Sequence, residues 1–132
     1  MKLLFSILAL LPFAVHAGSY SYSCKVKAEY VLTDSGELDL KNNLYFGSEF
    51  NVERKSGVVL GGGVGNSSYP TKQVIDIGSA DQSYKLIWIS SEVIGVSGAF
   101  NAIYLNVEEY NENLLKPYTL VLGSRTLTGT CK

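Results

Sequence analysis

Hydrophobic and polar residues alternate with a period of two along most of this chain. The alternation is clearest over residues 24–32, where every second residue is apolar, aromatic or cysteine: Cys24, Val26, Ala28, Tyr30 and Leu32. The opposite face would carry Lys25, Lys27 and Glu29. A two-residue period is typical of a half-buried β-strand, whereas an amphipathic helix repeats every 3.6 residues. The pattern therefore predicts a strand with an apolar inward face and a polar outward face.

Short polar turns separate this strand from further segments of the same kind. We predict strands at 24–32, 38–40, 46–54, 58–60, 74–77, 84–90, 102–110, 118–122 and 125–131, with one irregular strand around 93–100. The strands at 46–54 and 58–60 should form a hairpin, and no long window has helical periodicity. The chain is thus predicted to fold as one all-β domain of about eight to ten short antiparallel strands, either a β-sandwich or a small β-barrel.

The N-terminal residues have the composition of a secretory signal peptide. Lys2 supplies a positive charge, residues 3–11 are apolar except for one serine, and Val15 and Ala17 precede the predicted cleavage site. The apolar run is shorter than the roughly 20 residues that a transmembrane helix needs. We therefore expect residues 1–17 to be cleaved. Residues 18–132 would then form an exported domain in the periplasm or the extracellular medium, without a membrane span.

The chain contains two cysteines, Cys24 and Cys131, which bracket almost all of the predicted mature domain. Two cysteines of a small domain in an oxidising compartment usually form a disulfide. Each lies on the apolar face of its predicted strand, and a bridge requires their Cα atoms to lie within about 7 Å. The first and last strands should therefore be neighbours in the sheet or face each other across the core.

The composition excludes several classes of function. The single histidine, His16, lies in the predicted signal peptide, so the mature domain would lack Ser–His and Cys–His nucleophile pairs and histidine-based zinc sites. The formal net charge is −1, and the longest basic cluster is Arg54-Lys55, which does not resemble a nucleic-acid footprint. We expect no catalytic residues, no cofactor, no metal site and no nucleic-acid partner.

A glycine-rich stretch follows the predicted strand at 58–60. It contains Gly61, Gly62, Gly63 and Gly65 and continues to Tyr69. A glycine loop that binds phosphate normally leads into a helix N-terminus, and no helix is predicted here. We interpret the stretch as a mobile loop of about ten residues that joins two strands and contributes to a partner-binding surface.

The predicted strand at 84–90 is apolar on both faces. Tyr84, Leu86 and Trp88 fall on one face, and two isoleucines fall on the other. An apolar run of this length is typical of a strand in the centre of a fold. The functional alternative is that Tyr84 and Trp88 line a ligand cavity or meet a partner protein.

Acidic residues cluster within residues 34–39 and 108–112. Neither cluster has the ligand spacing of an EF-hand calcium loop, so we interpret both as solvated turns or strand ends. Two carboxylates held about 5–9 Å apart could also hydrolyse a glycoside. Because the chain has 12 Asp and Glu residues, some pair will meet that distance by chance.

Three functions remain compatible with these observations. The first is a non-catalytic exported binding protein that occupies a protein partner, as an inhibitor or an immunity protein does. The second is a small-ligand or glycan-binding β-barrel protein, which requires an enclosed pocket of at least about 300 Å³. The third is a carboxylate-dependent hydrolase, which requires two acidic groups in a cleft.

Overall fold

The computed structural model describes residues 20–64, 71–89 and 102–132, and these contain nine β-strands. Within those ranges there is no helix, and so none that could cross a membrane. The strands are β1 (Ser21–Leu32), β2 (Leu38–Leu40), β3 (Glu49–Glu53), β4 (Val59–Gly61), β5 (Thr71–Ile77), β6 (Tyr84–Ile89), β7 (Ala102–Val107), β8 (Lys116–Leu122) and β9 (Arg125–Cys131). The all-β prediction is confirmed. The irregular strand predicted around 93–100 lies outside the described residues.

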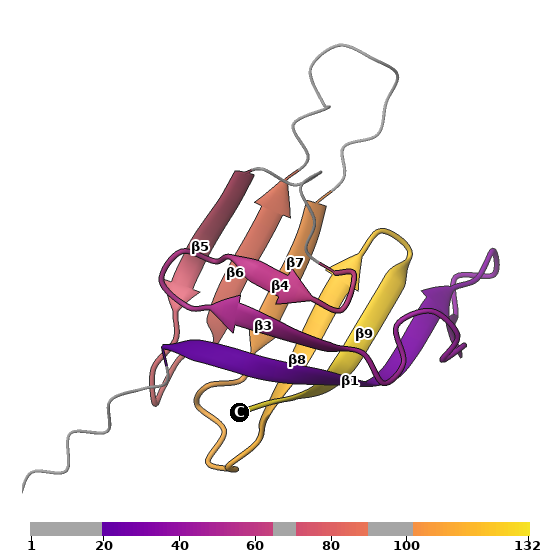
Figure 1. Cartoon of the computed structure of the whole chain (residues 1–132). Coiled ribbons are helices and arrows are strands. Elements are labelled where there is room, and N and C mark those ends of the chain that lie inside the picture. Colours follow the sequence, from indigo (N-terminus) through magenta and orange to yellow (C-terminus); the bar gives the residue numbers. More distant parts are fainter. Residues whose placement is uncertain (1–19, 65–70, 90–101) are drawn as a thin grey trace, which may run out of the picture.

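All nine strands belong to one antiparallel sheet that curls over on itself. Its order is β4-β3-β1-β9-β8-β7-β6-β5, and β2 pairs with the C-terminal part of β1. The first half of β1 crosses in front of β7 and β8 together with β3 and β4 (Figure 1). As far as the described residues extend, β4 and β5 do not pair, so the sheet is a half-barrel that does not close. It stands between the two predicted architectures, because its layers stack as in a sandwich but remain one continuous sheet.

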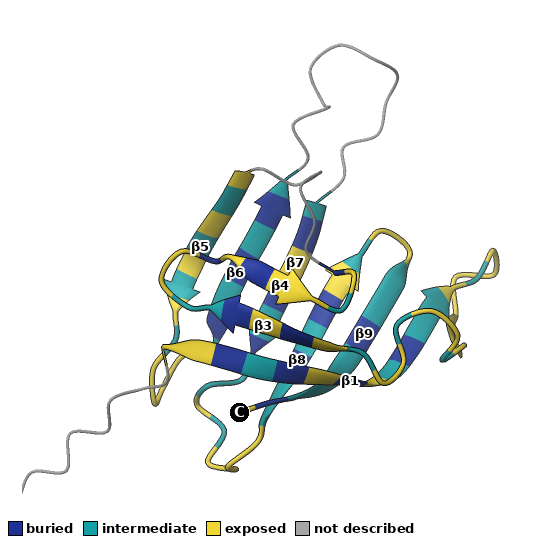
Figure 2. Ribbon diagram, in the orientation of Figure 1, coloured by how far each residue is buried: buried dark blue, intermediate teal, exposed yellow. Residues whose placement is uncertain are grey.

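The core lies between the two layers and is lined by alternate residues of each strand. β3 contributes Phe50 and Val52, and β6 contributes Tyr84, Leu86 and Trp88, all of them fully buried. Figure 2 shows these positions as dark bands where the layers overlap. Removal of apolar surface from water stabilises a fold by about 25 cal/mol per Å², so this enclosed face holds the two layers together. β6 pairs with β5 and β7, as expected of a central strand.

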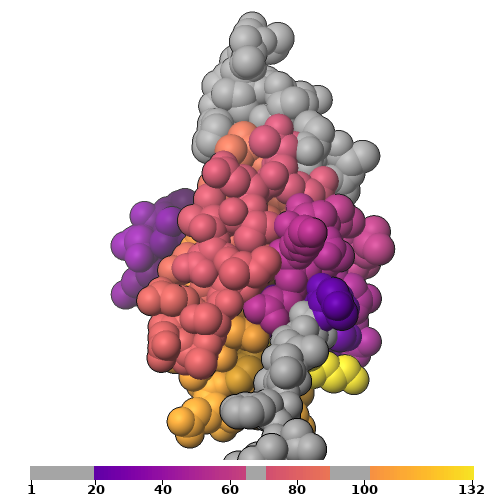
Figure 3. All heavy atoms as spheres, turned by 90° about the vertical axis from the view of Figure 1, so that its left-hand side faces the viewer, coloured from indigo at the N-terminus to yellow at the C-terminus, as the bar shows by residue number. Residues whose placement is uncertain are grey.

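The predicted hairpin is present and consists of β3 and β4. The turn between them packs against β5 and β6: a Cβ atom at Gly57 would lie 2.5 Å from Leu86 Cδ1 and 3.4 Å from Val74 Cγ2. Gly57 also has a φ of +71°, a conformation that favours glycine. Figure 3 shows the two segments side by side at the open edge of the half-barrel. Glycine at this position therefore permits both the turn and the close approach of the layers.

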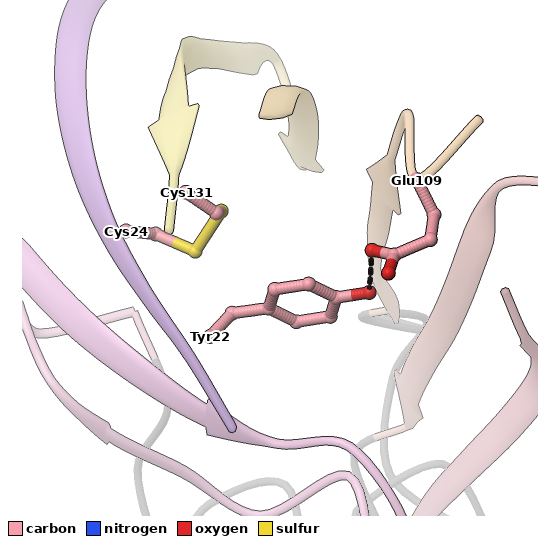
Figure 4. The surroundings of a disulfide bond; sticks show 4 residues. All are labelled: Tyr22, Cys24, Glu109 and Cys131. Carbon is pink, nitrogen blue, oxygen red and sulfur yellow. Dashed lines mark hydrogen bonds between the residues drawn. A yellow bond between two sulfur atoms is a disulfide. The ribbon is translucent and has the colours of Figure 1, made fainter. Parts of the chain in front are cut away.

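Cys24 and Cys131 form a disulfide that joins the first and last strands (Figure 4). They are direct partners in the antiparallel pair of β1 and β9, with Cα atoms 4.0 Å apart. The adjacent residues Ser23 and Lys132 exchange two backbone hydrogen bonds of 3.0 Å. The cysteines therefore form a non-hydrogen-bonded pair, in which side chains lie closest. The predicted disulfide and the predicted adjacency of the two strands are confirmed.

A β-bulge in β1 changes which of its residues face the core. The register with β9 shifts between Val26 and Ala28, which places one extra residue in β1. Beyond the bulge the alternation is inverted: Glu29 is fully buried and Leu32 is exposed. The prediction that Ala28, Tyr30 and Leu32 share the inward face while Glu29 lies on the polar face is therefore wrong. An extra residue in a two-residue repeat moves every later side chain to the other face.

Gly129 of β9 lies opposite this bulge. A Cβ atom there would lie 1.9 Å from the Lys25 carbonyl oxygen and 2.9 Å from Tyr118 Cε1. Glycine is the residue that allows another backbone and an aromatic ring to approach this closely. The bulge in β1 and the glycine in β9 therefore depend on each other, although they are at opposite ends of the chain.

Candidate binding surface

The C-terminal part of β1 forms a hairpin with β2 on one side and pairs over residues 28–31 with β9 on the other; we call residues 28–40 the arm (Figure 1). In the arm, Leu32 pairs with Leu38 and Tyr30 pairs with Leu40. Directly paired residues point to the same face of a sheet, and the bulge makes this the outer face. The three leucines are 50–58% exposed. The arm therefore presents an apolar face to solvent.

The tip of the arm is a hydrogen-bonded turn over residues 33–37. The backbone N–H of Thr33 donates to the Glu37 carbonyl at 2.8 Å, and the N–H of Gly36 donates to the Thr33 carbonyl at 2.9 Å. The Thr33 hydroxyl donates to the Glu37 carbonyl as well, at 3.0 Å. Gly36 has a φ of +84°, which favours glycine. This turn holds β2 in a single register against β1.

Glu29 anchors the base of the arm. Its carboxylate Oε2 accepts backbone hydrogen bonds from Leu44 and Tyr45, both at 2.9 Å, and Oε1 accepts one from the Arg125 guanidinium. Burial by itself would raise the pKa of the Glu29 carboxyl, but the two backbone donors and the guanidinium together hold that pKa below its usual range. Glu29 is thus a buried carboxylate ion that fixes the segment after β2.

The backbone of Glu29 binds the same segment. Its N–H donates to Asn42 Oδ1 at 2.8 Å, and its carbonyl accepts from the N–H of Lys41 at 2.9 Å. Asn42 has a φ of +46°, a left-handed conformation that asparagine adopts more readily than most residues. Side-chain and backbone bonds of Glu29 together make the base of the arm a rigid support.

The outer face of the arm continues into a row of side chains across the sheet. Successive cross-strand neighbours from β2 to β6, which we call the outer row, are Leu40, Tyr30, Thr126, Val121, Tyr104 and Ile87. At a strand spacing of about 4.8 Å the outer row is about 24 Å long. Leu40, Val121 and Tyr104 are exposed, the last two at 37% each, and Tyr30, Thr126 and Ile87 are half-buried. Together with the arm, the outer row forms a mainly apolar exposed band.

A polar cluster joins the two layers of the half-barrel; we call it the junction cluster. The Glu109 carboxylate accepts a hydrogen bond from the Tyr22 hydroxyl (Figure 4), and Glu109 Oε1 lies 3.3 Å from Arg54 Nη1. Arg54 Cζ lies 4.9 Å from the centre of the Tyr22 ring, and the Tyr84 hydroxyl donates to the Arg54 carbonyl at 3.1 Å. The cluster connects the ends of β1, β3, β6 and β7.

Both tyrosines of the junction cluster are held in the protonated form. Burial, and then the hydrogen bond to Glu109, raises the pKa of Tyr22 far above its usual value. Burial raises the pKa of Tyr84 to about 12. Each hydroxyl therefore remains a donor at neutral pH and serves as a fixed hydrogen-bonding group.

A depression of about 250 Å³ lies beside the disulfide. Its lining residues are Ser23, Cys24, Lys25, Lys27, Glu49, Leu115, Thr130 and Lys132. Lys25 forms an exposed ion pair with Glu49 at 3.4 Å. Because Lys27 and Lys132 also line the depression, its side chains carry net positive charge. Its volume is below the range of about 300–1,000 Å³ that is typical of small-molecule sites. Over the described ranges, no group of three His, Cys, Asp or Glu side chains could hold a metal ion.

The residues predicted to form a binding surface have different environments. Tyr84 and Trp88 are fully buried, so they are core residues and not exposed contact residues, which corrects that part of the prediction. Their side chains fill the inner face of a central strand. Residues 61–63 all have positive φ at the end of β4 and in the turn that follows. Gly65 and Tyr69 lie outside the described residues.

The alternation of residues does not identify the arm as a candidate surface. The Leu38-Asp39-Leu40 pattern predicts a strand but does not say whether another layer covers its leucines. One indication was available: a three-residue strand after a tight turn is typical of a sheet edge, where strands are short. Glu29 and Arg125 gave no such indication, because their contact depends on the bulge.

We compared the chain with protein-family models, with curated proteins and with solved structures. None matches it. A functional assignment therefore rests on the geometry and chemistry of the residues described above.

Proposed function

We propose that this protein is a non-catalytic exported binding protein that occupies a protein partner, in the manner of an inhibitor or an immunity protein. The observation that carries the proposal is the exposed apolar band formed by the arm and the outer row. Large apolar side chains that gather on one exposed face are typical of protein–protein contact sites.

The shape of this surface favours a protein partner over a small ligand. The band lies on the outer face of a curled sheet, whereas small-molecule sites are concave and enclose most of their ligand. The inner face is occupied by the protein's own aromatic side chains, since Phe50, Tyr84 and Trp88 are fully buried between the layers. A partner protein can cover an outward-facing band that a small molecule cannot enclose.

The disulfide supports export. Disulfides persist in oxidising compartments and are rare in the cytosol. The bond between Cys24 and Cys131 therefore fits a periplasmic or extracellular location, and residues 1–17 would supply the cleaved signal peptide.

The alternative is a small-ligand or glycan-binding protein. One observation favours it: the depression of about 250 Å³ beside the disulfide, where Lys27 and Lys132 would attract an anionic ligand. A carboxylate-dependent hydrolase has less support. Glu29 and Glu109, the two carboxylates with the least exposed ion pairs, each bind an arginine, which holds them as structural ion pairs.

Native mass spectrometry tests the proposal. The mature protein would be purified from its native compartment without reducing agent, as wild type, as the double variant Leu38→Asp/Leu40→Asp, and as the control Leu114→Asp. Leu114 is 91% exposed and lies between β7 and β8, away from the arm sequence. We expect the wild type and the control to carry a second protein and the arm variant to lose it. An adduct of small-molecule mass would instead support the alternative, and the bare mass in all three samples would contradict both.

A further inference from the structure

We infer that the arm enters an apolar depression in the partner protein and that basic side chains border this depression. The inference rests on the proposed function and adds the chemistry of the partner's site. Two properties of the arm carry it: the exposed leucines on its outer face, and negative charge at its tip that no ion pair among the described residues neutralises.

The exposed acidic side chains of the arm are Asp34, Glu37 and Asp39. Asp39 forms an ion pair with Lys41 at 2.5 Å. Asp34 and Glu37 make no ion pair through their carboxylates with any residue that the structure describes. Interfaces place positive potential opposite negative potential, which speeds encounter and suppresses wrong partners. A matching site would therefore have lysine or arginine side chains around an apolar centre.

The arm is ordered before it binds. Hydrogen bonds within residues 33–37 close its tip, and the bonds of Glu29 to Arg125 and to the segment after β2 fix its base. A preordered element loses less conformational entropy on binding than a flexible loop does. The arm therefore has the properties of an inserting element: an apolar face, a charged tip and a fixed geometry.

The basic surface of this chain itself is a poor fit for the arm. Lys25, Lys27 and Lys132 line the depression beside the disulfide. Its apolar lining consists of Leu115 and Cys24. An arm placed there by a second copy would meet mainly lysine and hydroxyl side chains and would leave most of its leucine surface in water. A different protein is therefore the better occupant.

Site-specific photo-crosslinking in the native host tests this inference. A photoreactive amino acid would replace Leu38 on the arm, Val121 in the outer row or Leu114 as the exposed control, each in the full chain. We expect a discrete crosslinked protein from position 38 and none from position 114. Peptide mapping should place the crosslink from position 38 in an apolar segment of the partner that is flanked by lysine or arginine.

Charge variants test the basic border of the partner's site. In the chain that carries the photoreactive residue at position 38, Asp34→Asn together with Glu37→Gln should lower the crosslinking yield about tenfold at low ionic strength. High salt should lower the yield of the unsubstituted chain in the same way. Asp81→Asn, which removes an exposed carboxylate between β5 and β6, should leave the yield unchanged.

Several results would overturn the inference. A crosslink from position 38 to another copy of this chain, or to an acidic segment of a partner, would exclude the stated site. A yield that does not respond to the charge variants or to salt would exclude the basic border. Crosslinks from position 121 but not from position 38 would move the contact to the body of the sheet and leave the proposed function standing. No crosslink from any position, with the bare mass in native mass spectra, would contradict both.

Discussion

Two carboxylate–arginine pairs hold different parts of this protein together. Glu29 and Arg125 lie at the base of the arm, and their side chains are 0% and 29% exposed. Glu109 and Arg54 lie in the junction cluster, with side chains that are 18% and 11% exposed. The first pair fixes a surface segment next to the arm, whereas the second connects the two layers of the sheet.

The two pairs differ in what else depends on the carboxylate. Glu29 also accepts two backbone N–H groups, which would lose their acceptor if the carboxylate were removed. In the junction cluster, aromatic contacts stabilise the arrangement in addition to the carboxylate. The rings of Tyr22 and Tyr84 lie 5.2 Å apart, and Arg54 lies over the Tyr22 ring. Loss of one partner from a buried pair is costly because it leaves the other group uncompensated. The comparison therefore predicts that Glu29 contributes more to stability than Glu109 does.

The largest effect on stability should come from loss of the disulfide, which joins the first and last strands of the sheet. Cys24→Ser/Cys131→Ser should lower the free energy of unfolding by roughly 4–5 kcal/mol, because the unfolded chain regains the entropy of a long loop. Urea unfolding monitored by tryptophan fluorescence would measure it, with reduced wild type as the control. An unchanged midpoint would show that the bond contributes no stability.

Glu29→Gln should lower the free energy of unfolding by about 3 kcal/mol, since Arg125 then lacks its buried counter-ion and the backbone donors face a weaker acceptor. The matched control is Glu49→Gln, which removes an exposed ion pair with Lys25 and should not change the unfolding midpoint measurably. Equal effects of the two variants would refute the anchoring role of Glu29.

Glu109→Gln should lower the free energy of unfolding by about 1–2 kcal/mol, less than the change at Glu29, because the amide can still accept from Tyr22. Tyr22→Phe removes the hydroxyl but keeps the ring and its contact with Arg54, so its effect should be smaller, about 1 kcal/mol. A larger loss for Glu109→Gln than for Glu29→Gln would reverse the comparison.

Acid should weaken the contribution of Glu29. The folded-state pKa of Glu29 is depressed, so the stability that its carboxylate contributes is present above the unfolded-state pKa of about 4.3 and is lost as the pH falls through the folded-state pKa. We expect the stability difference between wild type and Glu29→Gln to be constant above about pH 5 and to shrink below it. A difference that stays constant down to pH 2 would show that ionisation of Glu29 is not its source.

The smallest effect on stability should come from the apolar face of the arm. Leu38→Asp removes an exposed side chain, so the unfolding midpoint should stay within experimental error of wild type, in keeping with the ±0.5 kcal/mol typical of surface positions. A marked loss of stability would mean that the arm leucines are structural, and it would weaken the proposal that they contact a partner.

Local alternation was enough to predict most strands and the disulfide, because a two-residue period depends only on neighbouring residues. It failed at the bulge in β1. That irregularity depends on Gly129 in the last strand, whose missing side chain admits the Lys25 carbonyl. No pattern near residue 27 reports this, so Glu29 was assigned to the wrong face. This one bulge is the reason that Glu29, which was predicted to face solvent, is buried.

The candidate surface was harder to predict than the fold. The leucines of the arm are exposed because the bulge in β1 turns them to the outer face of the sheet, and no pattern near them reports that bulge. The junction cluster has the same difficulty, since Tyr22, Arg54 and Glu109 come from three separate strand ends. Trp88 is the opposite case, because this aromatic residue was a candidate for binding but is fully buried in the core.

The position of the disulfide also determines how the domain responds to mechanical tension. Cys24 and Cys131 are separated by 107 residues in sequence but pair directly at one point of the sheet. A force applied to the chain outside them would first separate residues 21–23 from β3 and would then pass through the covalent bond, so the chain between the cysteines is not extended. Without that bond, the same pull could extend the intervening chain to roughly 360 Å. With it, lengthening is confined to the residues outside the bond, and the strands between the two cysteines are protected from the pull.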